Sequence, residues 1–188
     1  MRSKNTVDRY GSLSIGMHWL MLLLLIAVYA AINLHDVAAK GSALRADLKL
    51  WHFIFGLAIL ALVALRLIIR FNAGSAPAIT PPISRWQHTS AQTTHIALYV
   101  FMISMPLLGW LALSAKGDPV SLFGLQLPLP IAKDKSLSSA LRETHETIGT
   151  IGYYLIALHT LAALYHHYVK RDNTLLRMWP KCWLRKKP

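Results

Sequence analysis

The chain has 188 residues, of which 54% are hydrophobic, and a mean hydropathy of +0.39. The apolar residues come in long uncharged blocks, which excludes an ordinary soluble domain of this length. The net charge of +12 alone would suggest nucleic-acid binding, but the distribution of the basic residues along the chain argues against nucleic acid as a partner.

Four stretches of the chain can cross a bilayer as helices. About 20 helical residues cross a hydrocarbon core of about 30 Å. The sequence predicts spans at residues 12–35, 50–71, 92–115 and 143–169, followed by a basic tail at residues 170–188. Little chain is left for anything else. We therefore expect a single all-α membrane domain, a four-helix transmembrane bundle.

Three further features of the sequence bear on the spans and their connections. The first span follows basic residues, as a signal peptide would, but its uncharged length is too great and no convincing cleavage site follows, so we expect it to be retained. Residues 72–82 are rich in proline and small residues and should form a turn region. Pro106 should kink the third span.

The charges predict the orientation of the spans. With the N-terminus inside, thirteen basic residues fall on the cytoplasmic side and seven on the outer side, where acidic residues almost balance them. The positive-inside rule therefore predicts that both termini are cytoplasmic. The basic tail is expected to contact anionic membrane lipid.

Histidines supply the candidate chemistry. Five of them lie in or just inside the predicted spans: His18, His52, His95, His145 and His159. Ionisable residues in membrane spans are costly and usually face the bundle interior for a functional reason. Neutral imidazole is also a common ligand of haem iron.

The fourth span predicts two sites along one helix face. His145 and His159 are 14 residues apart, which places them on the same face about 21 Å apart. Gly149 and Gly152 lie between them on the same stripe, where small residues would let a flat macrocycle approach the backbone.

Depth in the membrane predicts the partners. His52 and His145 each follow a basic residue at the outer end of their spans, so they should meet near the outer surface. His18 and His159 lie at similar depths near the inner surface. The sequence thus predicts two bis-histidine sites, each shared between helices.

The second span adds two candidate cofactor contacts. Arg66 lies 14 residues from His52, at the inner depth, and Gly56 lies one turn from His52. A buried arginine needs an anion. A propionate of an inner haem would serve, and the alternative is that Arg66 reaches the lipid headgroups.

Two further histidines are candidates for quinone binding. His95 lies at the depth of His18 and His159, and the pattern alone does not decide which two of these three bind iron. His166 lies seven residues beyond His159. His95 and His166 could each hydrogen-bond a quinone or carry its proton. The alternative for His166 is contact with lipid phosphate.

Several short motifs surround these residues: residues 14–19 (SIGMHW), 50–52 (LWH), 66–70 (RLIIR), 144–147 (THET), 157–159 (ALH), 166–168 (HHY) and 172–178 (DNTLLRM). Through them, nearly the whole chain resembles the bacterial cytochrome b561 family, four-helix di-haem b proteins that include superoxide oxidase. The stretch from residue 166 through residue 178 is the most specific, because it is long and has no evident packing reason.

The resemblance implies that two haems b have four histidine ligands: His18, His52, His145 and His159. It leaves His95 unligated and places it, with His166, near a quinone site. It also implies an oxidoreductase of the bacterial inner membrane that passes electrons from superoxide, on the outer side, to ubiquinone. Lys133, Lys135 and Arg142 lie near His145 and could attract such a small anion.

Two other functions stay open at this point. One is a haem-bearing membrane anchor that relays electrons from a separate dehydrogenase, although no feature demands an obligatory protein partner. The other is a proton-coupled transporter with histidine and arginine relays, which predicts a colourless protein. The sequence does not identify the electron donor or the direction of electron flow.

Overall fold

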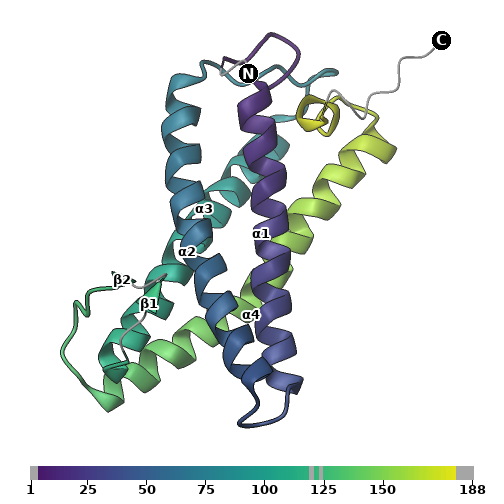
Figure 1. Ribbon diagram of the computed structural model, residues 1–188. Coiled ribbons are helices and arrows are strands. Elements are labelled where there is room, and N and C mark those ends of the chain that lie inside the picture. Colours follow the sequence, from purple (N-terminus) through teal and green to yellow (C-terminus); the bar gives the residue numbers. More distant parts are fainter. Residues whose placement is uncertain (1–3, 119–120, 123–124, 181–188) are drawn as a thin grey trace. The chain divides into compact units, whose positions relative to one another are not determined.

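A computed structural model describes residues 4–118, 121–122 and 125–180. Its elements in chain order are α1 (Ser12–Val37), α2 (Ala43–Asn72), α3 (Arg85–Lys116), β1 (Ser121–Leu122), β2 (Leu125–Gln126), α4 (Lys135–Tyr165), the π-helix η1 (His166–Lys170) and the 3-10 helix η2 (Leu176–Met178) (Figure 1). The two strands pair in antiparallel orientation, with Leu122 opposite Leu125.

The four long helices, the last of them continued by η1, have the length and apolar composition needed to cross a membrane. Each predicted span lies within one of these helical segments. The prediction of an all-α four-helix transmembrane bundle is therefore confirmed. The prediction that both termini are cytoplasmic stays a prediction.

Three helices begin well before the predicted spans. α2 begins at Ala43 rather than at residue 50, α3 at Arg85 rather than at residue 92, and α4 at Lys135 rather than at residue 143. The added turns contain good helix formers and no glycine or proline. Asp134 caps α4, because its Oδ1 accepts the N–H of Leu137 at 3.0 Å. Hydropathy detects contact with lipid, and it does not detect where a helix ends.

Arg45, near the start of α2, closes the C-terminal end of α1. Its Nη1 donates to the carbonyl oxygens of His35 at 2.7 Å and of Ala38 at 3.0 Å. The last carbonyls of a helix lack intrahelical partners and carry partial negative charge, so a guanidinium is well placed there. Gly41 has a φ of +81°, a conformation that residues with a side chain rarely adopt, and it lets the chain turn into α2.

The chain divides into two compact units, and each of the four long helices contributes to both. Unit 1 comprises Met1–Leu23, Leu62–Leu98 and Leu155–Pro188, and unit 2 comprises Leu24–Ala61 and Tyr99–Tyr154. Unit 1 contains both ends of the chain, so it is the half for which the sequence predicts a cytoplasmic location.

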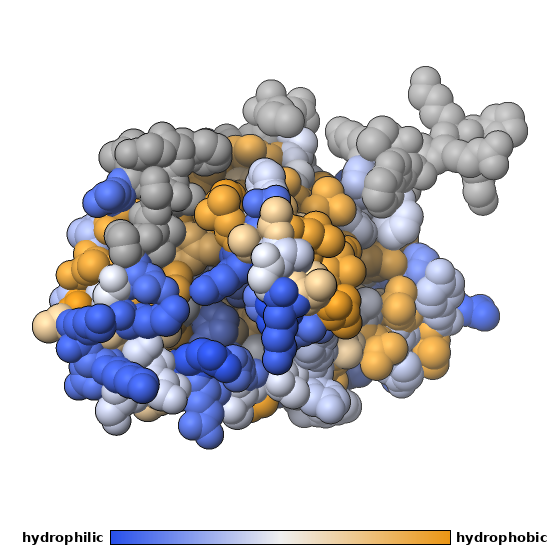
Figure 2. Space-filling model, turned by 60° about the horizontal axis from the view of Figure 1, so that its bottom comes forward, coloured by the Kyte–Doolittle hydropathy of each residue, from blue (hydrophilic) through white to orange (hydrophobic). Residues whose placement is uncertain are grey.

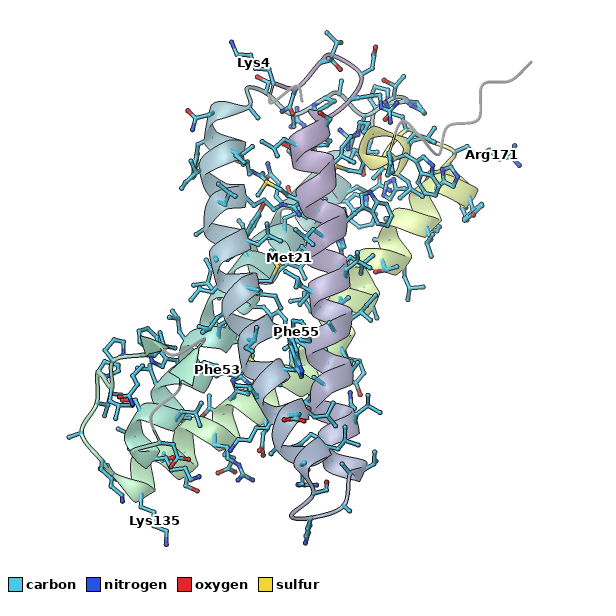
Figure 3. All side chains as sticks on the ribbon, in the orientation of Figure 1. Lys4, Met21, Phe53, Phe55, Lys135 and Arg171 are labelled. Carbon is cyan, nitrogen blue, oxygen red and sulfur yellow. The ribbon has the colours of Figure 1, made fainter. Side chains whose placement is uncertain are left out.

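In unit 1, three segments that are far apart in the sequence lie together: the residues before α1, the residues after α2 and the residues after η1. The labelled residues Lys4 and Arg171 lie at the end of the unit where these segments meet (Figure 3). The amide of Asn173 donates to Thr80 at 3.1 Å, and its side chain donates to Ala78 at 3.2 Å. Arg177, which is buried, donates to the carbonyl of Pro77. These bonds supply the packing reason that the sequence did not show for residues 172–178.

In unit 2, the loop that precedes α4 lies against α3. Ser114 is fully buried, and its Oγ lies 3.0 Å from the backbone nitrogen and 3.1 Å from the carbonyl oxygen of Ile131. Trp110 donates from Nε1 to the carbonyl oxygen of Pro128 at 3.1 Å. The C-terminal part of α3 therefore anchors the described residues of this loop.

Candidate functional site

Unit 2 brings together His52 of α2 and His145 of α4. Their ring centroids are 6.1 Å apart, and the ring planes are inclined by 77°. Nδ1 of His52 lies 3.0 Å from the carbonyl oxygen of Val28 in α1. Because a carbonyl oxygen only accepts, this bond puts the ring proton on Nδ1 and leaves the Nε2 lone pair available for a metal ion.

A glycine that sequence reasoning missed also faces this pair. A Cβ atom at Gly109 of α3 would lie 3.3 Å from Cε1 of His145 and 3.5 Å from Nδ1. The only signal in the sequence was a glycine inside an apolar span. Gly56 of α2 differs, since no heavy atom lies within 4 Å of where its Cβ would be.

Unit 1 brings together His18 of α1 and His159 of α4. Their ring centroids are 6.3 Å apart, and the planes are inclined by 70°. The neighbouring Trp19 donates from Nε1 to the carbonyl oxygen of Met178 at 2.9 Å, which ties this turn of α1 to the C-terminal segment. Each unit therefore contains one of the two predicted histidine pairs.

Arg66 of α2 contacts the His18 ring. Its Nη1 lies 3.1 Å from Nδ1 of His18. A guanidinium has donors and no acceptor, so Nδ1 accepts in this arrangement and the ring proton is on Nε2. A neutral imidazole that binds a metal through Nε2 carries its proton on Nδ1, so ligation by His18 requires Arg66 to turn toward another acceptor. The predicted propionate would be such an acceptor.

His95 of α3 is the third histidine of unit 1. Its ring centroid lies 5.4 Å from that of His159, and the planes are inclined by 64°. The side chain is more exposed than those of His18 and His159. The structure thus gathers the three histidines among which the sequence pattern could not choose.

The residues of each pair fit iron that is held in a porphyrin. An imidazole nitrogen bonds a first-row metal at about 2 Å and lies about 1.1 Å from the ring centre, so two imidazoles on opposite sides of one metal have centres about 6.2 Å apart. The distances of 6.1 Å and 6.3 Å agree with this spacing, and the 5.4 Å between His95 and His159 is shorter. Two side chains do not complete a site for a bare ion, but they complete one whose other four ligands are porphyrin nitrogens.

Gly149 and Gly152 of α4 have protein neighbours. A Cβ at Gly152 would collide with Phe101 and with the hydroxyl of Tyr29, and a Cβ at Gly149 would lie 3.4 Å from Cε of Met105. The Tyr29 hydroxyl also donates to the carbonyl oxygen of Gly149 at 2.7 Å. These glycines allow helices to pack closely in unit 2, and their contact with a cofactor stays a prediction.

His166 opens η1 and forms a pair with Asp172, a residue that sequence reasoning did not single out. Nδ1 of His166 hydrogen-bonds Oδ2 of Asp172, and Oδ1 accepts the N–H of Thr174 at 2.8 Å. Asp172 is only 4% exposed. Burial by itself would raise the pKa of the Asp172 carboxyl, but the hydrogen bonds from His166 and Thr174 outweigh burial and lower this pKa. Among the described residues, no hydrogen bond joins His166 to His95.

The predicted anion-attracting residues lie at one end of unit 2. Lys133, Lys135 and Arg142 line a hollow of about 700 Å³. Figure 2 turns this end of the unit toward the viewer and shows hydrophilic side chains gathered on it. Nε of Arg142 lies 2.8 Å from Oε1 of Glu146, so its charge is partly compensated, as is common for exposed ion pairs.

Residues 9–181 match the protein family described as prokaryotic cytochrome b561. Cytochrome b561 homolog 1 of Escherichia coli strain K12 is 36% identical over 175 residues, which cover 93% of this chain and 99% of that protein. The probable superoxide oxidase CybB of Yersinia pestis is 37% identical over 173 residues, which cover 92% of this chain and 97% of that protein. Cytochrome b561 homolog 2 of Escherichia coli strain K12 is 25% identical over 182 residues, or 96% of each chain.

Proposed function

The chain belongs to the prokaryotic cytochrome b561 family, and on this premise we propose that it transfers electrons from superoxide to ubiquinone by means of two haems b. Family membership and the four candidate spans make it a haem b-binding, electron-transferring, multi-pass protein of the bacterial inner membrane. The number of haems, their ligands, the donor and the acceptor belong to the proposal.

The observation that carries the proposal is the occurrence of one histidine pair in each unit, with the spacing that iron between two imidazoles requires. His52 and His145 would hold one haem, and His18 and His159 would hold the other. Iron in a bound haem supplies reversible one-electron chemistry. The protein side chains ligate the cofactor and exclude water from it, while Arg66 would bind a haem carboxylate.

The acceptor side of the proposal is supported by two further histidines of unit 1, His95 and His166. Reduction of a quinone to a quinol consumes protons as well as electrons, and a neutral imidazole can both donate and accept a proton. The hydrogen bond to Asp172 uses Nδ1 of His166, so Nε2 of the same ring is left to exchange a proton with a quinone. We assign quinone contact to His95 or His166, each of which lies outside the two predicted ligand pairs.

The donor side is supported by a relative and by charge. A protein that shares 37% of its residues with this chain is named a probable superoxide oxidase. Lys133 and Lys135 line the hollow of unit 2 and would raise the local concentration of a small anion. This attraction weakens as ionic strength increases, so superoxide capture should decrease in high salt.

The first experiment counts haems. Purified protein should show the visible spectrum of haem b, which changes on reduction, and a ratio of two haems per chain. His145→Ala and His159→Ala should each lose one haem, whereas His88→Ala, which alters an exposed histidine at the start of α3, should lose none. A colourless wild-type protein would instead favour the transporter, and equal losses in all three variants would contradict the ligand assignment.

The second experiment identifies the donor. Superoxide generated outside vesicles that contain the purified protein and ubiquinone should drive quinone reduction, and His145→Ala and His159→Ala should each abolish it. Protein with two reducible haems and no superoxide-driven turnover would rule out this donor. Co-purification of a dehydrogenase in equal amount would then favour the membrane anchor.

A further inference from the structure

We propose that Gly109 of α3 is a positioning residue that sets the ring orientation of His145. It would thereby affect the reduction potential of the haem in unit 2 and leave that of the haem in unit 1 unchanged. This inference rests on the proposed function in one respect, the ligation of iron by His145. α3 provides none of the four predicted ligands, so nothing in the ligand assignment itself gives Gly109 this role.

Gly109 and the His145 ring are so close that an added side chain would crowd the ring. A Cβ at Gly109 would lie 3.3 Å from Cε1 and 3.5 Å from Nδ1 of the imidazole ring. The first distance is tighter than an ordinary van der Waals contact, so either the ring or the helix would have to shift. The glycine backbone is therefore one wall of the space in which the His145 ring lies.

α3 is not free to move away from this contact. Along the same interface of unit 2, Phe101 of α3 faces Gly152 of α4, and Met105 faces Gly149. The contact at Gly152 is already too tight for one added methyl group. Because the two helices run antiparallel with these contacts at regular intervals, a methyl group at position 109 would displace the imidazole ring more easily than the helix.

The two rings of this site are held in different ways. Nδ1 of His52 is hydrogen-bonded to the Val28 carbonyl oxygen at 3.0 Å. Nδ1 of His145 is buried and makes no hydrogen bond of normal geometry within the described part of the chain, although the Met105 backbone lies beside it. Two features of α3, the Met105 backbone and Gly109, therefore lie against the His145 ring, whereas the His52 ring is held by a hydrogen bond to α1.

The contacts that fix the ring of a haem-binding histidine also affect the reduction potential of the haem. In unit 1 the neighbour that α3 presents to the α4 histidine is His95, which lies 5.4 Å from His159. The same helix therefore presents a glycine to one predicted ligand and a histidine to the other. A change at Gly109 is expected to alter one haem and to leave the other as it was.

Gly109→Ala tests the proposal in the purified di-haem protein. Haem content, the electron paramagnetic resonance of the oxidised protein and a redox titration would be compared with those of Gly16→Ala, a matched control. Gly16 is exposed, and no heavy atom lies within 4 Å of its Cβ position. We expect Gly109→Ala to shift the signal and the midpoint of one haem, or to lose that haem, with the second haem unchanged. Two unchanged haems, or two that change equally, would overturn the proposal.

A second measurement applies even if Gly109→Ala accumulates poorly. In the His145→Ala background the imidazole is absent, so Gly109→Ala should no longer lower the yield or the unfolding temperature of the protein. An equal loss in both backgrounds would show that the methyl group clashes with something other than the ring, and the proposal would be wrong. Fewer than two haems in the wild-type protein would instead refute the proposed function.

Discussion

At the scale of single residues, Arg66 has the most direct electrostatic effect on a predicted ligand. Its positively charged guanidinium lies 3.1 Å from Nδ1 of His18 and would pair with a propionate of a haem bound there. A fixed positive charge close to a redox centre stabilises the form that carries the extra electron. Arg66 should therefore raise the reduction potential of the haem bound in unit 1.

Arg66→Gln removes this charge and keeps a polar, though shorter, side chain. The change should lower one of the two midpoint potentials by about 60 mV, which corresponds to the loss of about 1.4 kcal/mol for a single electron. A redox titration monitored by absorbance measures this shift. Arg85→Gln, which alters an exposed arginine at the start of α3, is the control, and an equal shift in both variants would exclude a local effect.

Asp172 shows how one carboxylate organises the end of α4. It accepts from His166 and Thr174, and its pKa is lower than the usual 3.8. The folded protein therefore favours the ionised carboxylate more than the unfolded chain does. The stability that Asp172 contributes is present above pH 3.8 and is lost as the pH falls through the lower pKa of the folded state.

Asp172→Asn should consequently destabilise the protein by about 1–3 kcal/mol at pH 7, since charge-assisted hydrogen bonds are lost inside the structure. Thermal unfolding in detergent, measured at pH 7 and again near pH 3, checks both the size and the sign of the effect. The difference from wild type should shrink at the lower pH. Asp8→Asn, at an exposed position, should change neither value, and a constant difference would contradict this account.

At the scale of elements, the interface between α3 and α4 within unit 2 depends on small residues. Gly152 is buried where Phe101 and Tyr29 converge, and Tyr29 additionally bonds the carbonyl oxygen of Gly149. Helices in a membrane gain little from burying apolar surface, because lipid is equally apolar. They associate instead through close packing and interhelical hydrogen bonds. Both kinds of contact are present here.

Gly152→Ala should overpack this interface and reduce stability by about 1–3 kcal/mol. The unfolding temperature in detergent is the measurement. Gly16→Ala adds the same methyl group to an exposed helical position, where alanine by itself favours the helix by about 1 kcal/mol over glycine. If Gly152→Ala proved as stable as Gly16→Ala, the close contact with Phe101 and Tyr29 would not limit the stability of the protein.

At the scale of the whole molecule, the charge distribution predicts the orientation in the membrane. Thirteen of the twenty basic residues fall on the side that holds both termini, and the outer loops are nearly balanced in charge. By the depths predicted from the sequence, this orientation would place His52 and His145 toward superoxide outside the cell membrane and His18 and His159 toward the cytoplasm. Orientation is therefore tied to the proposed direction of electron flow.

Reporter fusions at the C-terminus test this orientation. A fused fluorescent protein that matures only in the cytoplasm should be bright, and a fused alkaline phosphatase that requires export should be inactive. The reverse pattern would place Lys133 and Lys135 inside the cell and would remove their proposed role in attracting superoxide. A fusion within the loop between α1 and α2 should give the opposite result to the C-terminal fusion.

The sequence by itself determined the four spans and the histidines that lie along them, because hydropathy and helical spacing are local properties of a chain. His145 and His159, for example, follow from spacing along one helix. Only the tertiary structure decided which residues surround these histidines: Gly109 against His145, Arg66 against His18, and Asp172 against His166. The contacts of Gly109 and Arg66 depend on the register in which separate helices pack, and the contact of Asp172 depends on how the chain folds back after η1. No periodicity in the sequence specifies that register or that path of the chain.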